Sequence, residues 1–505
     1  MLSSTAATAP LPPSTMKSDE LEGAGPVAGL DYDDDPLRFA ALEINFVYTS
    51  RHNVYISLPP TCWYLFPHRH ATDITPARVA AWLGFAERRV TGSFTLALPT
   101  LLGPEMRDLP EHKKKRALEL PASARAEAMS LSMGYATLTA PAAGASSFHA
   151  LGDLFLGHAH IEPGGAAERG LGELLSAASC PRLRRLRLEH ITGLSALRLD
   201  AAATLEELRL DHLNDLASLE LDAPGLRSLH VGDCYMMVSK GAAARISAPR
   251  LETMACSEIC RPDRLEFHGA AAVRSLEKMS LYSHAPDEHW NAGAVGLLRL
   301  CTAADSLHVG IMPFETCPFQ SNLKENTEEM MSHVPELHNV TNLTIDVHPG
   351  FWHKLKATMA VFIAKCSLVE CLSISISYAN NSCSRPGCLC SQDDDPMFSL
   401  EHLREAKITG FNRSSKYHQS LVQLMISGAP ILERMTIQLI KATTSPSNAQ
   451  NNGKELGFNM PRKGQWAPCT SESWNQDHAT IYEWILEKKN EDDGNSSDGL
   501  ILSGF

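Results

Sequence analysis

Leucines recur in triplets of the form L-x-x-L-x-L along the middle of the chain. In the stretch 194–221, LSALRLDAAATLEELRLDHLNDLASLEL, triplets begin at Leu194, Leu205 and Leu216. On a helix, the first and last leucines of a triplet would lie roughly 140° apart and would share no narrow apolar stripe. On a strand, the last two leucines of a triplet point to the same face. The pattern therefore favours short strands.

Residues that interrupt helices lie beside these triplets. They are Pro181, Gly193, Pro224, Gly225 and Pro249. An interval of eleven residues also suits a helix with about 3.67 residues per turn. The positions of the prolines and glycines instead indicate strands and turns repeated along a solenoid.

Copies of the triplet continue along the chain. The clear copies begin at residues 151, 183, 205, 226, 251 and 276, and looser ones begin at residues 304, 340, 369, 403 and 432. The triplets at 194 and 216 lie midway between clear copies, so we predict a period of 21 to 25 residues with two short strands per coil. The later coils are longer, and we expect helices at 353–366 and 417–427.

One copy fits the leucine-rich repeat formula. Residues 226–236, LRSLHVGDCYM, match L-x-x-L-x-L-x-x-C-x-L with conservative changes. Other copies depart from it, because Ile191 and Leu213 stand where Asn or Cys is expected. We predict an α/β fold: an irregular, horseshoe-like leucine-rich repeat solenoid of short parallel strands and helices. Its leucines supply the core, so function must reside in the residues between them.

The strand residues that flank the inward leucines point outward. In a solenoid such residues line one continuous parallel sheet, which is the usual binding surface. Their mixed charge favours a protein partner over an apolar small molecule. The predicted outward pairs also include Ser228, Ser280, Ser306 and His308. The predicted partner-binding residues are Arg185, Arg187, Glu207, Arg209, His230 and Lys278.

The stretch 399–439 reads as a strand, a loop, a helix and a second strand. Apolar residues alternate at Ala406 and Ile408, and Leu421 and Leu424 lie on one helical stripe. Gly428 stands where the residue after a helix is expected, and Pro430 follows it. We predict one solenoid coil with a full helix.

Several segments resemble one plant family. LREAKITGF and GAPILERMTI, with the helix between them, look like an FBD region. The repeat-region segments that look similar are RVTGSFTLALP (89–99), SFHALGDLFLGHAHI (147–161) and CPRLRRLRLEHITGL (180–194). Together they resemble the grass-type F-box proteins with leucine-rich repeats and a C-terminal FBD region. The resemblance covers roughly residues 35 to 440.

This resemblance implies a substrate receptor of an SCF-type ubiquitin ligase. In that family the F-box binds a Skp-type adaptor and through it a cullin, while the repeats select the protein client. An F-box, with an L-P-D-D-x-L-like opening and an S-R-R-W-like stretch, is not found here. Residues 30–46, LDYDDDPLRFAALEINF, resemble the segment that follows it. Either the sequence is truncated or this copy has lost its box. The alternative function is a repeat scaffold or decoy that binds partners without recruiting a ligase.

Charge and composition narrow the partners. The chain has 45 basic and 58 acidic residues and a formal charge of −13, which argues against a general nucleic-acid binder. No secretory signal or run of 18 apolar residues is found, so we expect no membrane association and a cytoplasmic or nuclear location. The thirteen cysteines are then expected to be reduced thiols.

Metal-binding and catalytic patterns are weak. Cys383, Cys388 and Cys390 could hold zinc with His402 or Cys371, but paired C-x2-C hooks are missing, so thiols in a loop are the favoured interpretation. The pair Cys256 and Cys260 is a weaker metal candidate still, and Cys256 is expected in the core because it occupies an inward strand position. The HRH (68–70) and HAH (158–160) pairs are expected by chance among 21 histidines. No G-x-S-x-G, Walker A, H-E-x-x-H or G-x-G-x-x-G motif is present. We expect no enzyme activity, no cofactor and no metal.

The predicted organisation has five parts. They are a disordered N-terminus (1–35), an N-terminal region with the first coils (36–128), the solenoid (129–395), an FBD-like unit (396–440) and a partly disordered tail (441–505). Within the tail, 479–489 is expected to form a short helix or strand that covers the apolar end of the array.

Overall fold

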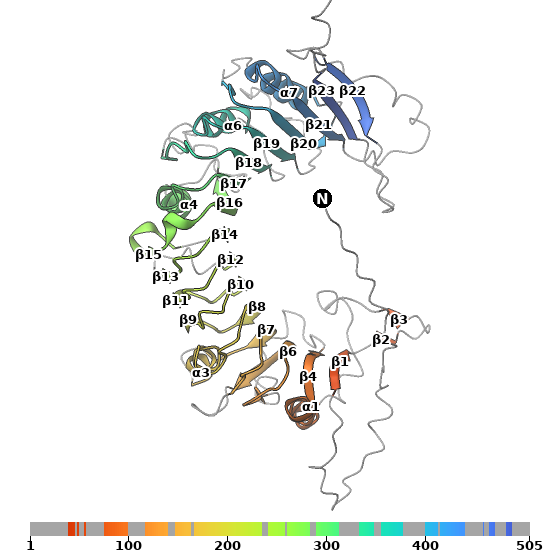
Figure 1. Ribbon diagram of the computed structural model, residues 1–505, viewed down its shortest axis with the longest axis vertical. Coiled ribbons are helices and arrows are strands. Elements are labelled where there is room, and N and C mark those ends of the chain that lie inside the picture. Colours follow the sequence, from red (N-terminus) through yellow and green to blue (C-terminus); the bar gives the residue numbers. More distant parts are fainter. Residues whose placement is uncertain are drawn as a thin grey trace, which may run out of the picture.

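A long, curved and mostly parallel β-sheet runs through the chain (Figure 1). It belongs to a computed structural model. The described residues are 39–45, 48–49, 55–56, 75–98, 117–139, 147–162, 166–234, 241–257, 260–282, 289–312, 333–347, 355–376, 399–412, 415–439, 458, 464–469 and 481–486.

The strands of the main sheet follow one another as neighbours, one per coil, and line the inner side of the arc (Figure 1). Each strand is parallel to the next. In order they are β1 (Phe39–Asn45), β4 (Val90–Leu98), β6 (Ala128–Thr139), β7 (Asp153–His160), β8 (Arg185–Thr192), β10 (Glu207–Asp211), β12 (Ser228–Gly232), β14 (Thr253–Cys256), β16 (Ser275–Tyr282), β17 (Ser306–Met312), β18 (Asn342–Val347), β19 (Cys371–Ile376), β20 (Glu405–Phe411) and β21 (Arg434–Leu439). This arrangement is a solenoid-like α/β fold.

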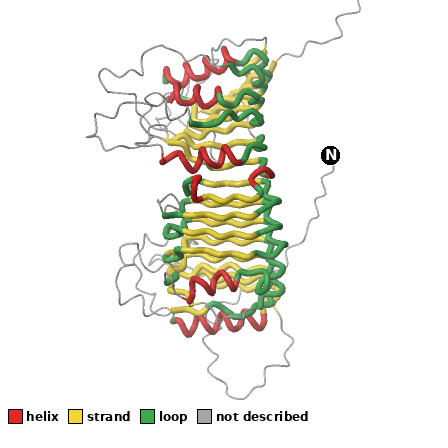
Figure 2. The backbone as a smooth tube through the Cα atoms, turned by 90° about the vertical axis from the view of Figure 1, so that its left-hand side faces the viewer, coloured by secondary structure: helices red, strands yellow, loops and turns green. Residues whose placement is uncertain are grey.

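The outer side of the arc carries helices and a second sheet (Figures 1 and 2). The second sheet is parallel and consists of β9 (Ala196–Asp200), β11 (Ser218–Asp222), β13 (Ala243–Ser247) and β15 (Leu265–His268). The helices are α1 (Pro76–Arg89), α3 (Ala166–Leu174), α4 (His289–Leu300), α6 (Leu355–Ala364) and α7 (Lys416–Gly428). The smaller elements are β5 (Ala117–Glu119), which pairs with β6, the antiparallel pair β2 (Tyr48–Thr49) and β3 (Tyr55–Ile56), and the 3-10 turns η7 (Pro262–Arg264) and η8 (Ala270–Ala272). The prediction of two strands per coil is confirmed from β8 to β15.

The core between the two sides is built from the apolar triplets. Leu186 of β8 lies opposite Leu208 of β10, which lies opposite Leu229 of β12. All three side chains are at most 1% exposed. Burying one leucine contributes about 1.5–3 kcal/mol, so each coil is stabilised mainly by stacking its leucines on those of its neighbours.

One predicted triplet has the wrong phase. The triplet beginning at Leu276 was expected to match the one beginning at Leu251, but Leu276 lies opposite Met254, the second member of that triplet. The pairing of β16 with β17 then shifts between Leu276 and Met279. The reason is a β-bulge that adds one residue, so Met279 regains the inward position.

The C-terminal coil forms as predicted, with β20, α7 and β21 in order. The helices expected at 353–366 and 417–427 are α6 and α7. Gly428 does not follow α7; it is the last residue of the helix, and the cap is Ala429.

The tail segment expected to cover the array forms strand β23 (Ile481–Leu486). It pairs antiparallel with β21 and with β22 (Gly464–Cys469). Trp484 of β23 is 1% exposed and covers the last coil. The predicted N-terminal segment 1–35 lies outside the described residues. Within the described part of the chain, no helix has both the length and the apolar character needed to span a membrane.

Candidate functional site

The inner face of the arc presents outward side chains in register on neighbouring strands. Arg185 of β8 lies opposite Glu207 of β10, and Arg187 lies opposite Arg209. Arg209 in turn lies opposite His230 of β12. The strands thus place five of the six predicted partner-binding residues together on one surface.

Most of the charges on this surface are paired. Both carboxylate oxygens of Asp153 accept hydrogen bonds from Arg185, at 2.5 and 2.6 Å. This contact raises the pKa of the Arg185 guanidinium. Arg187 forms an ion pair with Glu189 at 2.7 Å and lies 5.5 Å from the centre of the Phe155 ring. Such exposed ion pairs contribute little to folding, because water and salt screen them, so a partner can replace them at small cost.

Lys278 does not join this group. It is the exposed residue in the bulge of β16, and strand β14 separates it from His230 of β12. Its backbone φ of 55° lies in the left-handed region. The even alternation assumed from the sequence fails here because of the inserted residue.

A second column of side chains runs across the C-terminal parts of strands β6, β7 and β8 and the residues directly after β10 and β12. It contains Tyr135, His158, His190, His212 and Asp233, each with a backbone φ between 51° and 62°. The left-handed residue interrupts the in–out alternation of side chains along the strand. Two successive side chains therefore point away from the core before an apolar side chain points inward again. The rings contact one another along the column. Tyr135 meets His158 edge-on with ring centres 5.6 Å apart, His158 stacks on His190 at 4.8 Å, and His190 meets His212 in a tilted arrangement at 4.2 Å.

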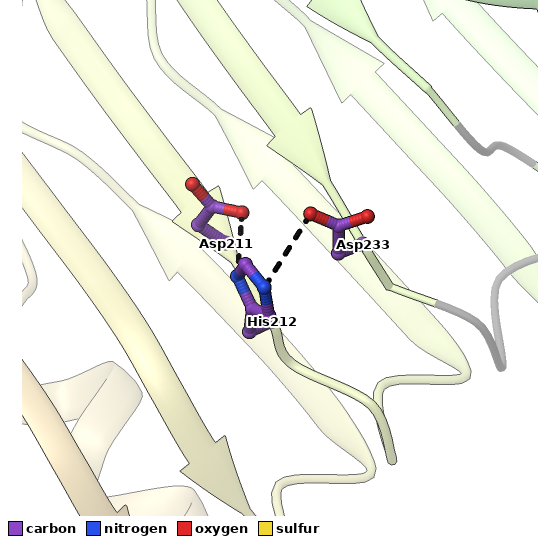
Figure 3. A group of neighbouring side chains, drawn as sticks. All are labelled: Asp211, His212 and Asp233. Atoms are coloured by element: carbon purple, nitrogen blue, oxygen red, sulfur yellow. Dashed lines mark hydrogen bonds and ion pairs between the residues drawn. The ribbon is translucent and has the colours of Figure 1, made fainter. Parts of the chain in front are cut away.

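At one end of this column, His212 lies between two carboxylates (Figure 3). Its Nδ1 is 3.0 Å from Oδ1 of Asp211, and its Nε2 is 3.5 Å from Oδ2 of Asp233. Each of Asp211, His212 and Asp233 offers one atom that could bind a metal ion, and these three atoms all lie within 4.8 Å of one another. In the described part of the chain, this is the group of three or more His, Cys, Asp or Glu residues with a geometry that could hold a metal ion.

Asp211 is held ionised although it is only 4% exposed. Burial by itself would raise its pKa. Hydrogen bonds from His230 and Arg209 outweigh burial, and the pKa of this carboxyl lies well below its usual range. Nη2 of Arg209 is 2.5 Å from Oδ2 of Asp211, and Nε2 of His230 is 3.6 Å from the same oxygen. The other carboxylate oxygen of Asp211, Oδ1, faces His212.

Comparison of the chain with protein-family models, with curated proteins and with solved structures finds no match in any of the three.

The sequence reasoning missed the column and its carboxylates. A signal for the column was available in the sequence. Three residues after the start of each of the segments 156–159, 188–191, 210–213 and 231–234 stands an apolar residue or a cysteine, and the residue directly before it is His in LGHA, LEHI and LDHL and Asp in VGDC. These residues recur once per coil, as the leucines do. Ile191 and Leu213 were noted as departures from the repeat formula, but the histidines before them were not.

The other metal candidates lie elsewhere. His158 and His160 of the HAH pair contact different residues, since Nδ1 of His158 is 3.2 Å from the Ser132 hydroxyl and Nδ1 of His160 is 3.0 Å from the Thr192 hydroxyl. The HRH pair and the cysteines Cys383, Cys388 and Cys390 lie outside the described residues. Cys256 is buried, as predicted, and Cys260 is buried as well.

Proposed function

We propose that this chain is a non-enzymatic protein-recognition module of the leucine-rich repeat type, and that the inner face of its main sheet binds a protein client. The observation that carries the proposal is the in-register polar surface on β7, β8, β10 and β12. Arg185, Arg187, Glu207, Arg209 and His230 lie side by side there on a rigid sheet. Repeat proteins commonly bind partners through such concave sheets.

The chemistry of this face suits a protein segment with alternating charges. Each arginine is balanced by a nearby carboxylate, so the face offers donors and acceptors of both signs. Arginine and aromatic side chains such as Phe155 are enriched at protein interfaces. The net charge of −13 disfavours a nucleic acid as the partner.

The resemblance to F-box proteins with leucine-rich repeats and an FBD region extends this proposal. In that form the client is a substrate of an SCF-type ubiquitin ligase, the further partners are a Skp-type adaptor and a cullin, and the protein acts in the cytoplasm or nucleus. The coil formed by β20, α7 and β21 supports an FBD-like unit, because its strand, helix and strand follow the order expected from that resemblance.

Charge reversal tests the inner face. The double variant Arg185→Glu and Arg187→Glu is expected to lose the partner recovered with the unmodified protein from plant extract. Arg198→Glu with Arg245→Glu is the matched control, because both arginines lie on the outer sheet, in β9 and β13, and also pair with glutamates. Circular dichroism checks that both variants fold. Loss of the partner in the control alone would move the binding surface to the outer side.

A scaffold or decoy that recruits no ligase is the alternative function. Co-purification with a Skp-type adaptor and cullin separates the two. Stoichiometric recovery supports a ligase receptor. Recovery of the client without adaptor or cullin supports the scaffold or decoy.

A further inference from the structure

The ends of strands β10 and β12 place the His212 imidazole between the carboxylates of Asp211 and Asp233 (Figure 3). His212 and Asp233 follow residues that lie opposite each other, Asp211 and Gly232. Their φ angles, 55° and 51°, are nearly the same. The backbone therefore places these two residues at matching positions on neighbouring strands.

The two contacts of His212 differ in length. Its Nδ1 lies at an ordinary hydrogen-bond distance from Asp211, 3.0 Å. Its Nε2 lies 3.5 Å from Oδ2 of Asp233, which is long for an N–H···O bond, whose usual length is about 2.9–3.0 Å. When Nδ1 carries the proton and donates a hydrogen bond to Asp211, Nε2 keeps its lone pair, and Oδ2 of Asp233 lies 3.5 Å from it.

We propose that His212 Nε2 and the Asp233 carboxylate bind a divalent transition metal ion, with zinc the best fit. Zinc lies about 2.0–2.2 Å from nitrogen and oxygen ligands, so two ligands at a tetrahedral angle are separated by about 3.4 Å. The observed 3.5 Å matches this separation. An imidazole nitrogen with a carboxylate oxygen suits zinc, whereas magnesium and calcium prefer oxygen ligands alone.

Asp211 supplies the outer contact that such a histidine needs. A metal-binding histidine generally donates its second ring N–H to a carboxylate, which fixes the ring and the tautomer. Oδ1 of Asp211 receives this hydrogen bond, while Oδ2 contacts Arg209 and His230. The ring of His190, 4.2 Å away, packs against His212 and holds its plane.

Gly232 leaves room for this arrangement. A Cβ atom at that position would lie 2.7 Å from Nε2 of His230 and 3.1 Å from Oδ1 of Asp211. The side chains of His212 and Asp233 remain 39% and 45% exposed. An ion bound there would keep coordination positions open to water or to a side chain of a partner. The proposal stands whether or not the inner face binds a protein.

Zinc titration of the full-length, metal-free protein tests the site, by calorimetry at neutral pH. Asp233→Asn and His212→Asn remove one ligand each, and asparagine tolerates the left-handed backbone. We expect each variant to lose one zinc equivalent or to bind it at least about tenfold more weakly. Asp222→Asn is the matched control, since Asp222 is exposed on β11 of the outer sheet, and it should bind zinc as the unmodified protein does.

Cobalt substitution separates this site from the cysteines, because thiolate ligands give charge-transfer absorption and a histidine–carboxylate site does not. We expect a visible cobalt spectrum without thiolate bands that disappears in Asp233→Asn. Unchanged zinc affinity and stoichiometry in both ligand variants would overturn the proposal. So would the absence of zinc binding at submillimolar concentration, which would leave His212 as an imidazole paired with two carboxylates.

Discussion

Left-handed backbone at non-glycine residues is the unusual feature at the scale of single residues. Such a conformation costs about 1–2 kcal/mol per residue, yet five of these residues follow one another in neighbouring coils, from Tyr135 to Asp233. Ring stacking and the contacts of His212 offset part of that cost. The sequence predicts the buried leucines because residues that are buried in every coil recur at regular intervals along the chain. The hydrophobic pattern does not reveal the column, because the residues that recur there are polar and a positive φ has no hydrophobic signature.

Gly193 is a residue whose side chain is excluded by the next coil. Its φ is +79°, and a Cβ atom would lie 1.9 Å from the Ile161 carbonyl oxygen. We expect Gly193→Ala to lower the free energy of unfolding by at least about 2 kcal/mol, measured by urea denaturation. Gly241→Ala is the control, because a Cβ atom there meets nothing within 4 Å. Equal stability of the two variants would contradict the close approach of the coils.

His418 makes the C-terminal coil sensitive to acid. Burial lowers its pKa from 6.5 to about 4, and its Nδ1 accepts a hydrogen bond from the Asn412 N–H. Below pH 6.5 this histidine is protonated in the unfolded chain, whereas in the folded chain it stays neutral down to about pH 4. The free energy of unfolding therefore falls as the pH falls from 6.5 to 4. The expected loss from this group between pH 7 and pH 5 is about 2 kcal/mol.

His418→Asn retains an acceptor but does not titrate. Urea denaturation at both pH values should therefore show a smaller loss of stability in the variant than in the unmodified protein. If the two proteins lose the same stability, His418 is already protonated in the fold or does not limit this coil.

At the scale of elements, the sequence predicts strands better than it predicts their register. The triplets at 205, 226 and 251 form β10, β12 and β14 as expected. The triplet at 276 is assigned three residues out of phase, because Val273 serves as its first apolar residue and a bulge follows Leu276. A local bulge is set by the pairing of β16 with β17, which no single segment encodes. The prediction of the binding residues fails at Lys278 for the same reason, because the bulge displaces Lys278 from the surface that Arg185 and Arg209 share.

Strand β23 covers the apolar end of the array with the buried side chains of Trp484 and Tyr482. Trp484 is 1% exposed, whereas its neighbour Ile485 is 50% exposed. We expect Trp484→Ala to destabilise the last coil by about 3–5 kcal/mol and Ile485→Ala to cost about 1 kcal/mol or less. Hydrogen exchange should rise in β21 and β20 of the first variant only. Similar exchange in both variants would mean that the strand contributes backbone pairing but little side-chain cover.

At the scale of the whole molecule, each coil packs mainly on the coils beside it, as the strand pairing shows. A solenoid built in this way is stabilised by intrinsic coil energies and by nearest-neighbour interfaces. The sequence predicts this organisation from its repeating triplets. It also predicts the outer strands β9 and β11 and the helices α6 and α7, but not the helices α3 and α4, because short apolar runs suit either element.

Buried cysteines can report how far a disturbance travels along the array. Burial raises the pKa of Cys180 and of Cys366 to about 12, so both thiols are unreactive in the folded chain. Cys180 directly precedes the coil of β8, and Cys366 lies between α6 and β19, nearer the C-terminal end.

In Trp484→Ala, we expect thiol labelling in mild urea to accelerate at Cys366 and to stay unchanged at Cys180. Nearest-neighbour stabilisation requires this difference, because the loss at β23 weakens β21 and then β20 before it reaches the coil of β19. Mass spectrometry of labelled peptides measures both rates in one sample. Equal acceleration at the two cysteines would show instead that the array unfolds as one cooperative unit.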